Sequence, residues 1–299
     1  MKETVPLDKK TWMRSTLILF LLQLSSPHWR VSAYSFANKK VLVTGSSGGI
    51  GAGIAKRLAC EGARVLVHYN TRQEGAEATR DLIRAQNGIC DGIVQCDFTQ
   101  PTNVRNMFDQ VDSLWDGKID ILVNNAGLIS KLATEDDDDD ISTWLDTIQV
   151  NLNAPYQLSK LAHERMRGQS NGGVIINVSS IHGSISVEYM TAYAASKAGL
   201  DRLTAGLASE WANDNVRVNA VAPGVVPVER TAEAMAKKEV QDLWRPHLPV
   251  GRMGTVEEIA HSVVYLCENE WSTGTILTID GGMTARANMP FRPKPSPSQ

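Results

Sequence analysis

Cysteine and net charge are both scarce in this sequence, and each shortage argues against a class of protein. Its 299 residues include four cysteines, with no C-x-x-C spacing, which argues against a disulfide framework or a zinc site. A net charge of -3 leaves no basic footprint for nucleic acid. There are no internal repeats. The remaining composition, 42% hydrophobic, is enough for one substantial core, in which we expect the cysteines to be small buried apolar residues.

The first 38 residues form a segment unlike the rest. Basic residues from Lys9 to Arg14 precede an apolar run at 16–24, which is too short to span a bilayer. Small residues at Val31-Ser32-Ala33 then provide a cleavage-like site. The order is typical of a signal peptide. An amphipathic organelle presequence or a loosely ordered extension are the alternatives.

One sequon bears on the destination of the chain. Asn177-Val178-Ser179 lies inside a strand-like run, where a glycan would prevent folding. The site is therefore skipped, or the chain does not enter a glycosylating lumen. Secretion, an organelle such as a plastid, and the cytoplasm all stay open.

Between residues 39 and 285, short β-branched runs alternate with longer amphipathic stretches. This alternation predicts an α/β fold, a single doubly wound domain whose parallel sheet has helices on both faces. The Pro-rich residues 286–299 are expected to be an extended appendage. The strands are expected at 41–43, 63–68, 92–95, 119–123, 174–178, 217–221 and 275–279.

A glycine-rich turn follows the first expected strand and opens the first helix. It reads Thr44-Gly45-Ser46-Ser47-Gly48-Gly49-Ile50-Gly51, with the spacing G-x-x-x-G-x-G. At this position a backbone approaches a pyrophosphate closely, and the helix N-terminus favours its charge. The turn therefore predicts a dinucleotide site.

Tyr193 and Lys197 stand four residues apart in a stretch from Thr191 to Trp211 that is expected to be helical. At this spacing the phenol and the ammonium share one face of the helix. A cation beside a phenol favours the phenolate, which suits proton transfer near neutral pH. The spacing alone is weak, since an exposed surface pair would look the same.

Several ordered motifs make the chain resemble the short-chain dehydrogenase/reductase family over roughly Lys39 to Gly282. The resemblance implies a Rossmann-type fold and an NAD(P)(H)-dependent oxidoreductase that interconverts a carbonyl group and a secondary alcohol. The matching motifs are the turn Thr44–Gly51, Asn124-Asn125-Ala126-Gly127, Asn151, Ser180, the Tyr193/Lys197 pair, Ala222-Pro223-Gly224 and Asp280-Gly281-Gly282.

The resemblance implies a catalytic tetrad. Tyr193 would exchange the substrate hydroxyl proton, and Lys197 would lower the pKa of Tyr193 and bind the nicotinamide ribose. Ser180 would polarise the carbonyl, a role that its spacing to Tyr193 favours over Ser179. Asn151 would hold a water that links Lys197 to solvent.

The same resemblance assigns the cofactor site. Asp97 would contact the adenine. No acid follows the second strand to bind a ribose 2′-hydroxyl, and Arg72 could bind a 2′-phosphate instead. NADP(H) is thus the preferred cofactor, although Gly48 stands where many NADP-dependent relatives have a basic residue. The alternative cofactor is NAD(H), in which case Arg72 is an exposed loop cation. The remaining contacts would come from Gly45, Ser47, Gly49, Ile50, Gly51, Asn125, Ala126, Gly127, Tyr193, Lys197, Pro223 and Gly224.

Other polar features have simpler interpretations. The acids at 135–140 are expected to start a helix rather than bind a metal, and no metal site is predicted. His182 is expected either to face the substrate or to form a hydrogen bond within its loop. His163 is expected at the surface, and Trp211 in the core or at a subunit interface.

Residues 225–250 are expected to form a lid of mixed apolar and charged character over the substrate. A small carbonyl compound, such as a 3-oxoacyl thioester, is the expected substrate; a sugar or alcohol dehydrogenase is the alternative within the family. The alternative to an enzyme is a non-catalytic protein of the same fold that binds the nucleotide without turnover. The resemblance also implies a homo-oligomer, either a dimer or a tetramer.

Overall fold

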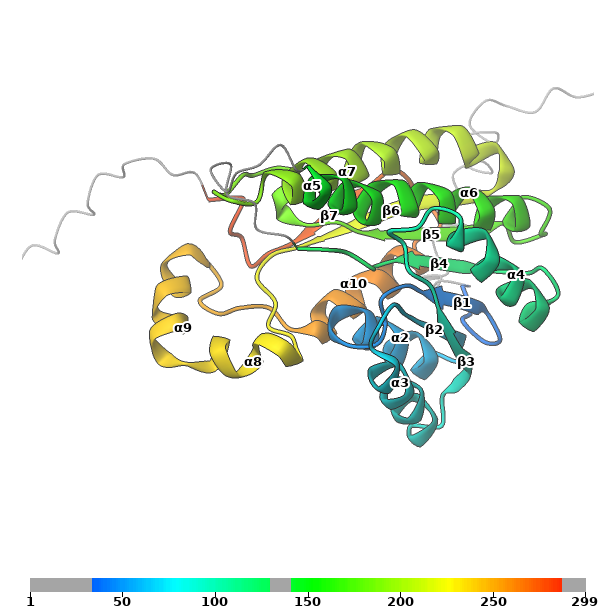
Figure 1. Ribbon diagram of the computed structural model, residues 1–299, viewed down its shortest axis with the longest axis horizontal. Coiled ribbons are helices and arrows are strands. Elements are labelled where there is room, and N and C mark those ends of the chain that lie inside the picture. The colour runs from blue at the N-terminus through cyan, green and yellow to red at the C-terminus, as the bar shows by residue number, and fades with distance from the viewer. Residues whose placement is uncertain (1–33, 130–140, 287–299) are drawn as a thin grey trace, which may run out of the picture. The chain divides into compact units, whose positions relative to one another are not determined.

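Seven parallel strands form the central sheet of the protein (Figure 1). The computed structural model describes residues 34–129 and 141–286. The sheet order is β3-β2-β1-β4-β5-β6-β7, which confirms the predicted doubly wound fold. The strands are β1 (Lys40–Val43), β2 (Arg64–Tyr69), β3 (Ile89–Gln95), β4 (Ile121–Asn124), β5 (Gly173–Val178), β6 (Val216–Pro223) and β7 (Ile276–Ile279).

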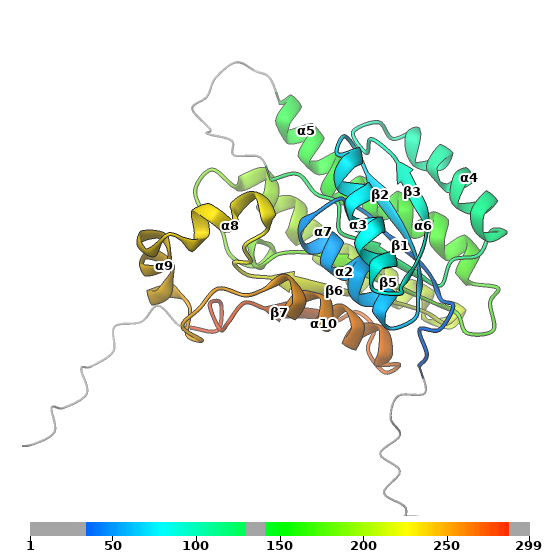
Figure 2. The same ribbon diagram turned by 90° about the horizontal axis from the view of Figure 1, so that it is seen from below.

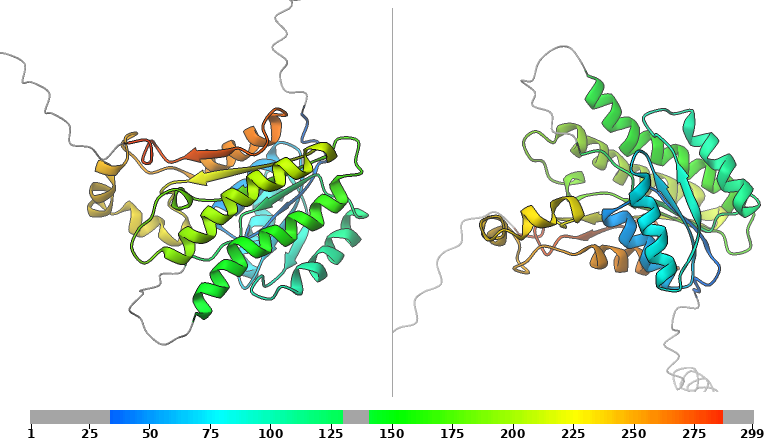
Figure 3. Two further views of the ribbon diagram at one scale, coloured as in Figure 1. Left: turned by 90° about the horizontal axis from the view of Figure 1, so that it is seen from above. Right: turned by 60° about the horizontal axis from the view of Figure 1, so that its bottom comes forward.

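Helices cover both faces of this sheet (Figures 2 and 3). Because side chains alternate along a strand, Val41 and Val43 enter one hydrophobic core while Leu42 enters the other. The first core is covered by α2 (Gly49–Cys60), α3 (Gln73–Ala85) and α10 (Val256–Glu268). The second is covered by α4 (Asn103–Trp115), α6 (Ala154–Met166) and α7 (Thr191–Trp211).

The sheet order fixes where a ligand can bind. The chain moves outward from β1 to β3 and then returns to the other side of β1 with β4. The carboxyl ends of β1 and β4 therefore border the crevice at the topological switch point, the usual ligand site of such sheets. All strand pairs are parallel, so every strand presents its carboxyl end at this edge.

The helical region from Ser142 to Met166 is not uniform. It consists of α5 (Ser142–Ile148), the π-helical segment η1 (Gln149–Asn153) and α6. Short π-helical segments are rare and often mark functional sites. Asn151 lies in the middle of this segment.

The lid contains two helices, α8 (Glu229–Ala236) and α9 (Lys238–Trp244). The remaining elements are the 3₁₀ turns η2 (Ile181–Gly183), η3 (Ala212–Asp214) and η4 (Arg245–His247). In the described part of the chain, no helix is long and apolar enough to cross a membrane.

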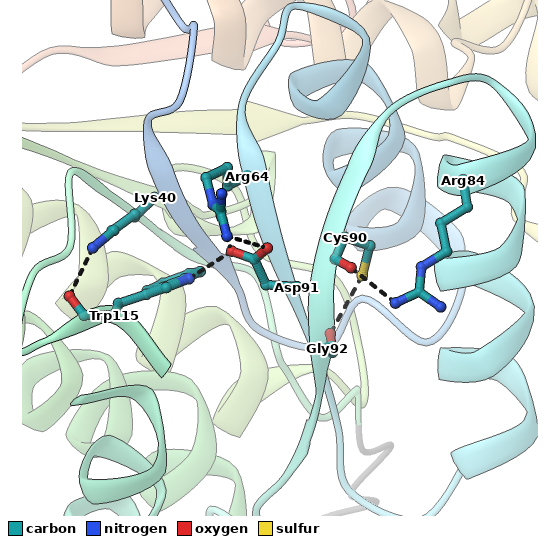
Figure 4. Close-up of polar contacts among 7 residues, drawn as sticks. All are labelled: Lys40, Arg64, Arg84, Cys90, Asp91, Gly92 and Trp115. Atoms are coloured by element: carbon teal, nitrogen blue, oxygen red, sulfur yellow. Dashed lines mark hydrogen bonds and ion pairs between the residues drawn. The ribbon is translucent and has the colours of Figure 1, made fainter. Parts of the chain in front are cut away.

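A bulge at the edge of the sheet organises a polar network (Figure 4). The pairing of β2 with β3 shifts at Val65/Leu66, which leaves Asp91 as the extra residue of β3. Its carboxylate accepts hydrogen bonds from Arg64 at 2.8 and 3.0 Å and from the Trp115 indole at 2.7 Å. The Trp115 side chain is fully buried, so Asp91 satisfies a donor that water cannot reach.

The packed unit begins before the predicted boundary at residue 39. Tyr34 and Phe36 pack against the first core, with their rings edge to face at 5.1 Å. Residues 1–33, the acids at 135–140 and the tail from residue 287 lie outside the described residues.

The cysteine prediction holds in part. Cys90, Cys96 and Cys267 are buried, whereas Cys60, at the end of α2, is exposed, so the prediction is wrong for Cys60. The sequon residue Asn177 is fully buried in β5. Its side-chain nitrogen donates a hydrogen bond to the Thr204 hydroxyl, and its side-chain oxygen accepts one from the Asn124 side chain. Its predicted place inside a strand is confirmed.

Candidate active site

A cleft of about 640 Å³ opens at the carboxyl edge of the sheet. It lies between the glycine-rich turn, the segment after β4, one face of α7 and the lid. Two predicted site residues, Asn151 and Asp97, are not part of its lining. The cleft brings together the other predicted residues: Gly45, Ser47, Gly49, Ile50, Gly51, Arg72, Asn125, Ala126, Gly127, Ser180, Tyr193, Lys197, Pro223 and Gly224.

The glycine-rich turn needs its glycines for space. Gly45 has a φ of +62°, and a Cβ there would lie 2.8 Å from the Ala126 Cα. A Cβ on Gly51 would lie 2.5 Å from the Gly45 carbonyl oxygen. The turn therefore packs directly against the segment after β4, and its backbone leads into α2. No side chain of the turn caps the N-terminus of α2, so an anion can bind its amides.

His68, at the carboxyl end of β2, holds this turn. Its Nδ1 accepts a hydrogen bond from the Gly45 amide at 2.9 Å, and its Nε2 donates to the Cys96 carbonyl oxygen at 3.1 Å. The ring also stacks on Phe98 at 4.5 Å. Burial lowers the pKa of His68 to about 4, so the ring is neutral and its tautomer is set by these partners.

The segment after β4 is tied to the same turn. The Thr44 hydroxyl accepts hydrogen bonds from the amides of Asn125 and Ala126 at 2.9 and 3.0 Å. The Asn125 side chain in turn donates to the carbonyl oxygens of Thr44 and Gly45. These contacts fix the two halves of the cofactor cleft relative to each other.

Arg72 follows β2 and lies over the glycine-rich turn. A Cβ added to Gly48 would lie 3.0 Å from its Nη1 atom, so the absence of a side chain at Gly48 makes room for this guanidinium. The Asp97 carboxylate accepts hydrogen bonds from the Thr99 amide and hydroxyl at 3.0 and 2.9 Å, and its predicted contact with the adenine stays a prediction. Thr99, rather than Asp97, lines the cleft.

A lid carboxylate reaches the same turn. Glu229, the first residue of α8, accepts a 2.7 Å hydrogen bond from the Gly49 amide. Gly49 is the first residue of α2, so the carboxylate lies where the helix N-terminus would attract an anion. Local sequence patterns do not identify Glu229, since the two residues are 180 positions apart.

Tyr193, Lys197 and Ser180 lie at the inner end of the cleft. Both α7 side chains are buried, at 8% and 4% exposure, which excludes the surface-pair interpretation. Burial raises the pKa of the Tyr193 phenol, and a hydrogen bond with Ser180 lowers it.

The predicted effect of Lys197 on Tyr193 is not what this structure contains. The Lys197 ammonium donates to the Val178 carbonyl oxygen at 2.8 Å and lies 5.6 Å from the centre of the Tyr193 ring. Ser180, not Lys197, is the group that lowers the pKa of Tyr193. Burial lowers the pKa of Lys197 to about 8.

Asn151 supports the site from behind. Its side chain donates to the Leu128 carbonyl oxygen at 2.9 Å and to the Ser196 hydroxyl at 3.1 Å, and it accepts from the Leu128 amide at 2.8 Å. The carboxamide thus joins the segment after β4 to α7. The water predicted at Asn151 stays a prediction.

Two histidines occupy different environments. His182 lines the cleft, with its ring edge-on to Tyr193 at 5.8 Å. His163 is buried, bonded to Asp214 at 2.7 Å and stacked on Trp211 at 4.3 Å. The predicted surface position of His163 is wrong because Trp211 folds over it.

Comparison with known proteins agrees with this geometry. A family model described as Enoyl-(Acyl carrier protein) reductase matches residues 45–284, from the glycine-rich turn to the end of the core. The chain belongs to the short-chain dehydrogenase/reductase family. The match includes all four tetrad positions and the complete cleft wall.

Similar members of this family differ in substrate. The chain is 37% identical over 255 residues to a 3beta-hydroxysteroid dehydrogenase of Eggerthella lenta, covering 85% of this chain and 96% of that protein. It is 35% identical over 248 residues to the 3-oxoacyl-[acyl-carrier-protein] reductase FabG of Aquifex aeolicus, covering 82% and 97%. A gluconate 5-dehydrogenase from Burkholderia cenocepacia, solved in complex with NADP and tartrate, superposes with a TM-score of 0.76 at 26% identity, covering 86% and 99%.

The site of this short-chain dehydrogenase/reductase fits a nicotinamide dinucleotide. The close backbone contacts of Gly45 and Gly51 and the N-terminus of α2 suit its phosphates, and the same cleft extends to Tyr193 and Lys197, where its ring would lie. When bound, the nicotinamide supplies or accepts the hydride. Among the described residues, no group of His, Cys, Asp and Glu side chains is arranged to hold a metal ion.

Proposed function

We propose that this chain is an NADP(H)-preferring carbonyl reductase that interconverts a ketone and a secondary alcohol. The observation that carries the proposal is the buried hydrogen-bonded pair of Tyr193 and Ser180, which lies in the same cleft as the glycine-rich turn. A proton donor and an oxyanion donor thus converge next to the dinucleotide site.

The roles of the residues follow from their positions. In reduction, Tyr193 gives its hydroxyl proton to the carbonyl oxygen as negative charge develops there, and Ser180 donates a hydrogen bond to the same oxygen. Lys197 would bind the ribose of the cofactor, and its positive charge would stabilise the resulting tyrosinate. Oxidation of the alcohol uses the same groups in reverse.

The substrate end of the cleft favours an apolar molecule. Ile129, Met190, Val225, Val226 and Met235 line it, and none of them can hydrogen bond a polyol. A 3-oxoacyl thioester is the first candidate, supported by the similarity to FabG. A hydroxysteroid is the second, supported by the greater identity to the Eggerthella lenta enzyme. A sugar fits this lining less well.

NADP(H) preference rests on charge at the end of β2. From His68 to Arg72 the chain has no acid that would bind a ribose 2′-hydroxyl, whereas the Arg72 guanidinium lies at the cleft wall beside Gly48. A guanidinium suits the dianionic 2′-phosphate. The NADP bound to the Burkholderia cenocepacia relative is consistent with this choice.

Oxidation of NADPH with a panel of carbonyl compounds tests the proposal. The panel contains acetoacetyl thioesters, 3-oxosteroids, quinones and sugars, and Tyr193→Phe is the control. We expect turnover with an apolar ketone, and a loss of about 10²–10⁴-fold in kcat in the variant. NADPH binding without turnover on any substrate would favour a non-catalytic nucleotide-binding protein, and full activity of the variant would exclude the proton-transfer role.

We also propose a homo-oligomer and a cleaved leader. Exposed apolar side chains on α5 and α6, including Leu145 and Tyr156, are suitable for subunit contact. Light scattering of the purified protein measures the oligomer. Amino-terminal sequencing of the mature protein tests for cleavage after Ala33, which would indicate export or import into an organelle.

A further inference from the structure

A third ionisable residue continues the active-site face of α7. Tyr193, Lys197 and Asp201 follow one another at four-residue intervals, so their side chains leave the helix on one side. The first two line the cleft, whereas Asp201 does not. Asp201 therefore lies behind the reacting groups.

The Asp201 carboxylate packs against the turn that contains Ser180. Burial raises the pKa of the Asp201 carboxyl group, and hydrogen bonding with Ser179, the residue directly before Ser180, lowers it. The Ser179 hydroxyl also donates to the Lys197 carbonyl oxygen at 3.5 Å, one turn before Asp201 on the same helix. On the other side of Ser180, a Cβ added to Gly183 would lie 2.3 Å from the Asp201 Oδ2 atom. The backbone of η2 can approach the carboxylate this closely because residue 183 is glycine. The carboxylate thus contacts the turn both before and after Ser180.

Asp201 also acts on Lys197 through charge. Burial disfavours the Lys197 cation, and Asp201 is the charged group that opposes this effect and raises the pKa of Lys197. The other groups near the ammonium are Tyr193 on the same helix and the neutral Val178 carbonyl oxygen. His182 on η2 faces the Tyr193 ring. The second carboxylate oxygen, Oδ1, is buried, and no partner among the described residues reaches it. Burying a carboxylate oxygen without a hydrogen-bond partner costs free energy. We therefore expect the Asp201 side chain to have a role that compensates for this cost.

We infer that Asp201 is a positioning residue of the proposed reaction, which keeps Lys197 in its cationic form and fixes the turn that carries Ser180. The inference rests on the proposed function. Asp201 does not contact substrate or cofactor; it acts through Lys197 and Ser179.

Asp201→Asn is the decisive variant, because asparagine keeps the shape and the acceptor for Ser179 but loses the charge. Without the carboxylate, Lys197 gives up its proton at lower pH. We therefore expect the alkaline limb of the kcat profile for reduction to move down by about 0.5–1 pH unit, with the KM for NADPH within about two-fold of the wild-type value. Glu210→Gln removes the same charge from an exposed position of the same helix and should leave the profile in place.

Ser179→Ala tests the second half of the inference. This variant keeps the charge of Asp201 and removes one contact to the turn, so we expect a lower kcat with the alkaline limb unchanged. An Asp201→Asn enzyme with a wild-type pH profile, or a loss of kcat equal at every pH, would overturn the charge role. A wild-type kcat in Ser179→Ala would overturn the role in fixing the turn. Failure of the proposed function is distinguishable, since wild-type enzyme would then show no turnover on any carbonyl.

Discussion

The Glu229 carboxylate accepts a 2.7 Å hydrogen bond from the Gly49 amide, which joins the first residue of the lid helix α8 to the first residue of α2. The N-terminus of α2 is where the phosphates of a dinucleotide are attracted. A fixed negative charge at this place opposes the arrival of another. The lid and the cofactor therefore compete for one end of the helix.

Removal of this charge should strengthen cofactor binding. We expect Glu229→Gln to lower the Kd for NADP(H) by about two- to five-fold at low salt, and less at high salt. Fluorescence titration of NADPH measures the change. Glu233→Gln, an exposed position on the same helix, is the matched control and should bind as the wild type does. Weaker binding in Glu229→Gln would mean that the carboxylate assists the cofactor.

Arg72 should decide between the two cofactors. Charge-assisted hydrogen bonds are worth about 1.5–3 kcal/mol, so we expect Arg72→Gln to weaken NADP(H) binding by about 10- to 100-fold. Binding of NAD(H) should change little, since it has no 2′-phosphate. Isothermal titration with both cofactors measures the ratio. Arg80→Gln changes another arginine of the same region, which pairs with Asp81, and is expected to have no effect. An equal loss for both cofactors would contradict the 2′-phosphate role.

His68 should make the fold sensitive to acid. Burial lowers its pKa to about 4 in the folded protein, against an ordinary value of 6.5, so below pH 6.5 the unfolded chain binds a proton that the folded chain does not. The contribution of neutral His68 to the free energy of unfolding is fully present above pH 6.5. It is lost as the pH falls towards 4, and the loss is ~3 kcal/mol at most. Urea unfolding between pH 4.5 and 7.5 measures it.

The matching variant for this experiment is His68→Asn. Asparagine can accept the hydrogen bond from the Gly45 amide but does not titrate. We expect a lower stability than wild type at neutral pH and a shallower decrease between pH 6.5 and 4.5. Parallel pH profiles for the two proteins would show that other groups cause the acid sensitivity.

Asp91 should stabilise the sheet edge far from the cleft. Asp91→Ala leaves the buried indole N–H of Trp115 without its acceptor, and an unsatisfied buried donor costs about 1–3 kcal/mol. We expect the free energy of unfolding to fall by this amount, with kcat unchanged. Asp109→Ala, exposed on α4, is the control. Equal stability of the two variants would mean that water replaces the carboxylate.

Local sequence signals predicted the fold and most of the site. The strands are continuous β-branched runs because central parallel strands are buried on both faces, as the fully buried β5 illustrates. The glycine-rich turn was recognisable because close backbone contacts, such as that of Gly45 with Ala126, allow no side chain. Both signals lie within a few consecutive residues.

Contacts between distant segments could not be predicted in this way. The partner of Lys197 is a backbone carbonyl of β5, and no side-chain pattern marks a carbonyl. Glu229 meets Gly49 from the lid. His68 did leave a signal, as a polar residue within an apolar strand, Val65–Tyr69, that ends at the cleft. Such a histidine has to find partners when the strand is buried.

The order of the strands has a consequence for synthesis of the chain. A ribosome releases β1, β2 and β3 first, and these can pair as soon as they emerge. The other edge of β1 has no strand partner until β4 is synthesised, about 80 residues later. The outer edge of β4 is then unpaired until β5 is synthesised. A nascent chain therefore contains the glycine-rich turn well before it contains Tyr193, and its unpaired strand edge is open to aggregation during that interval.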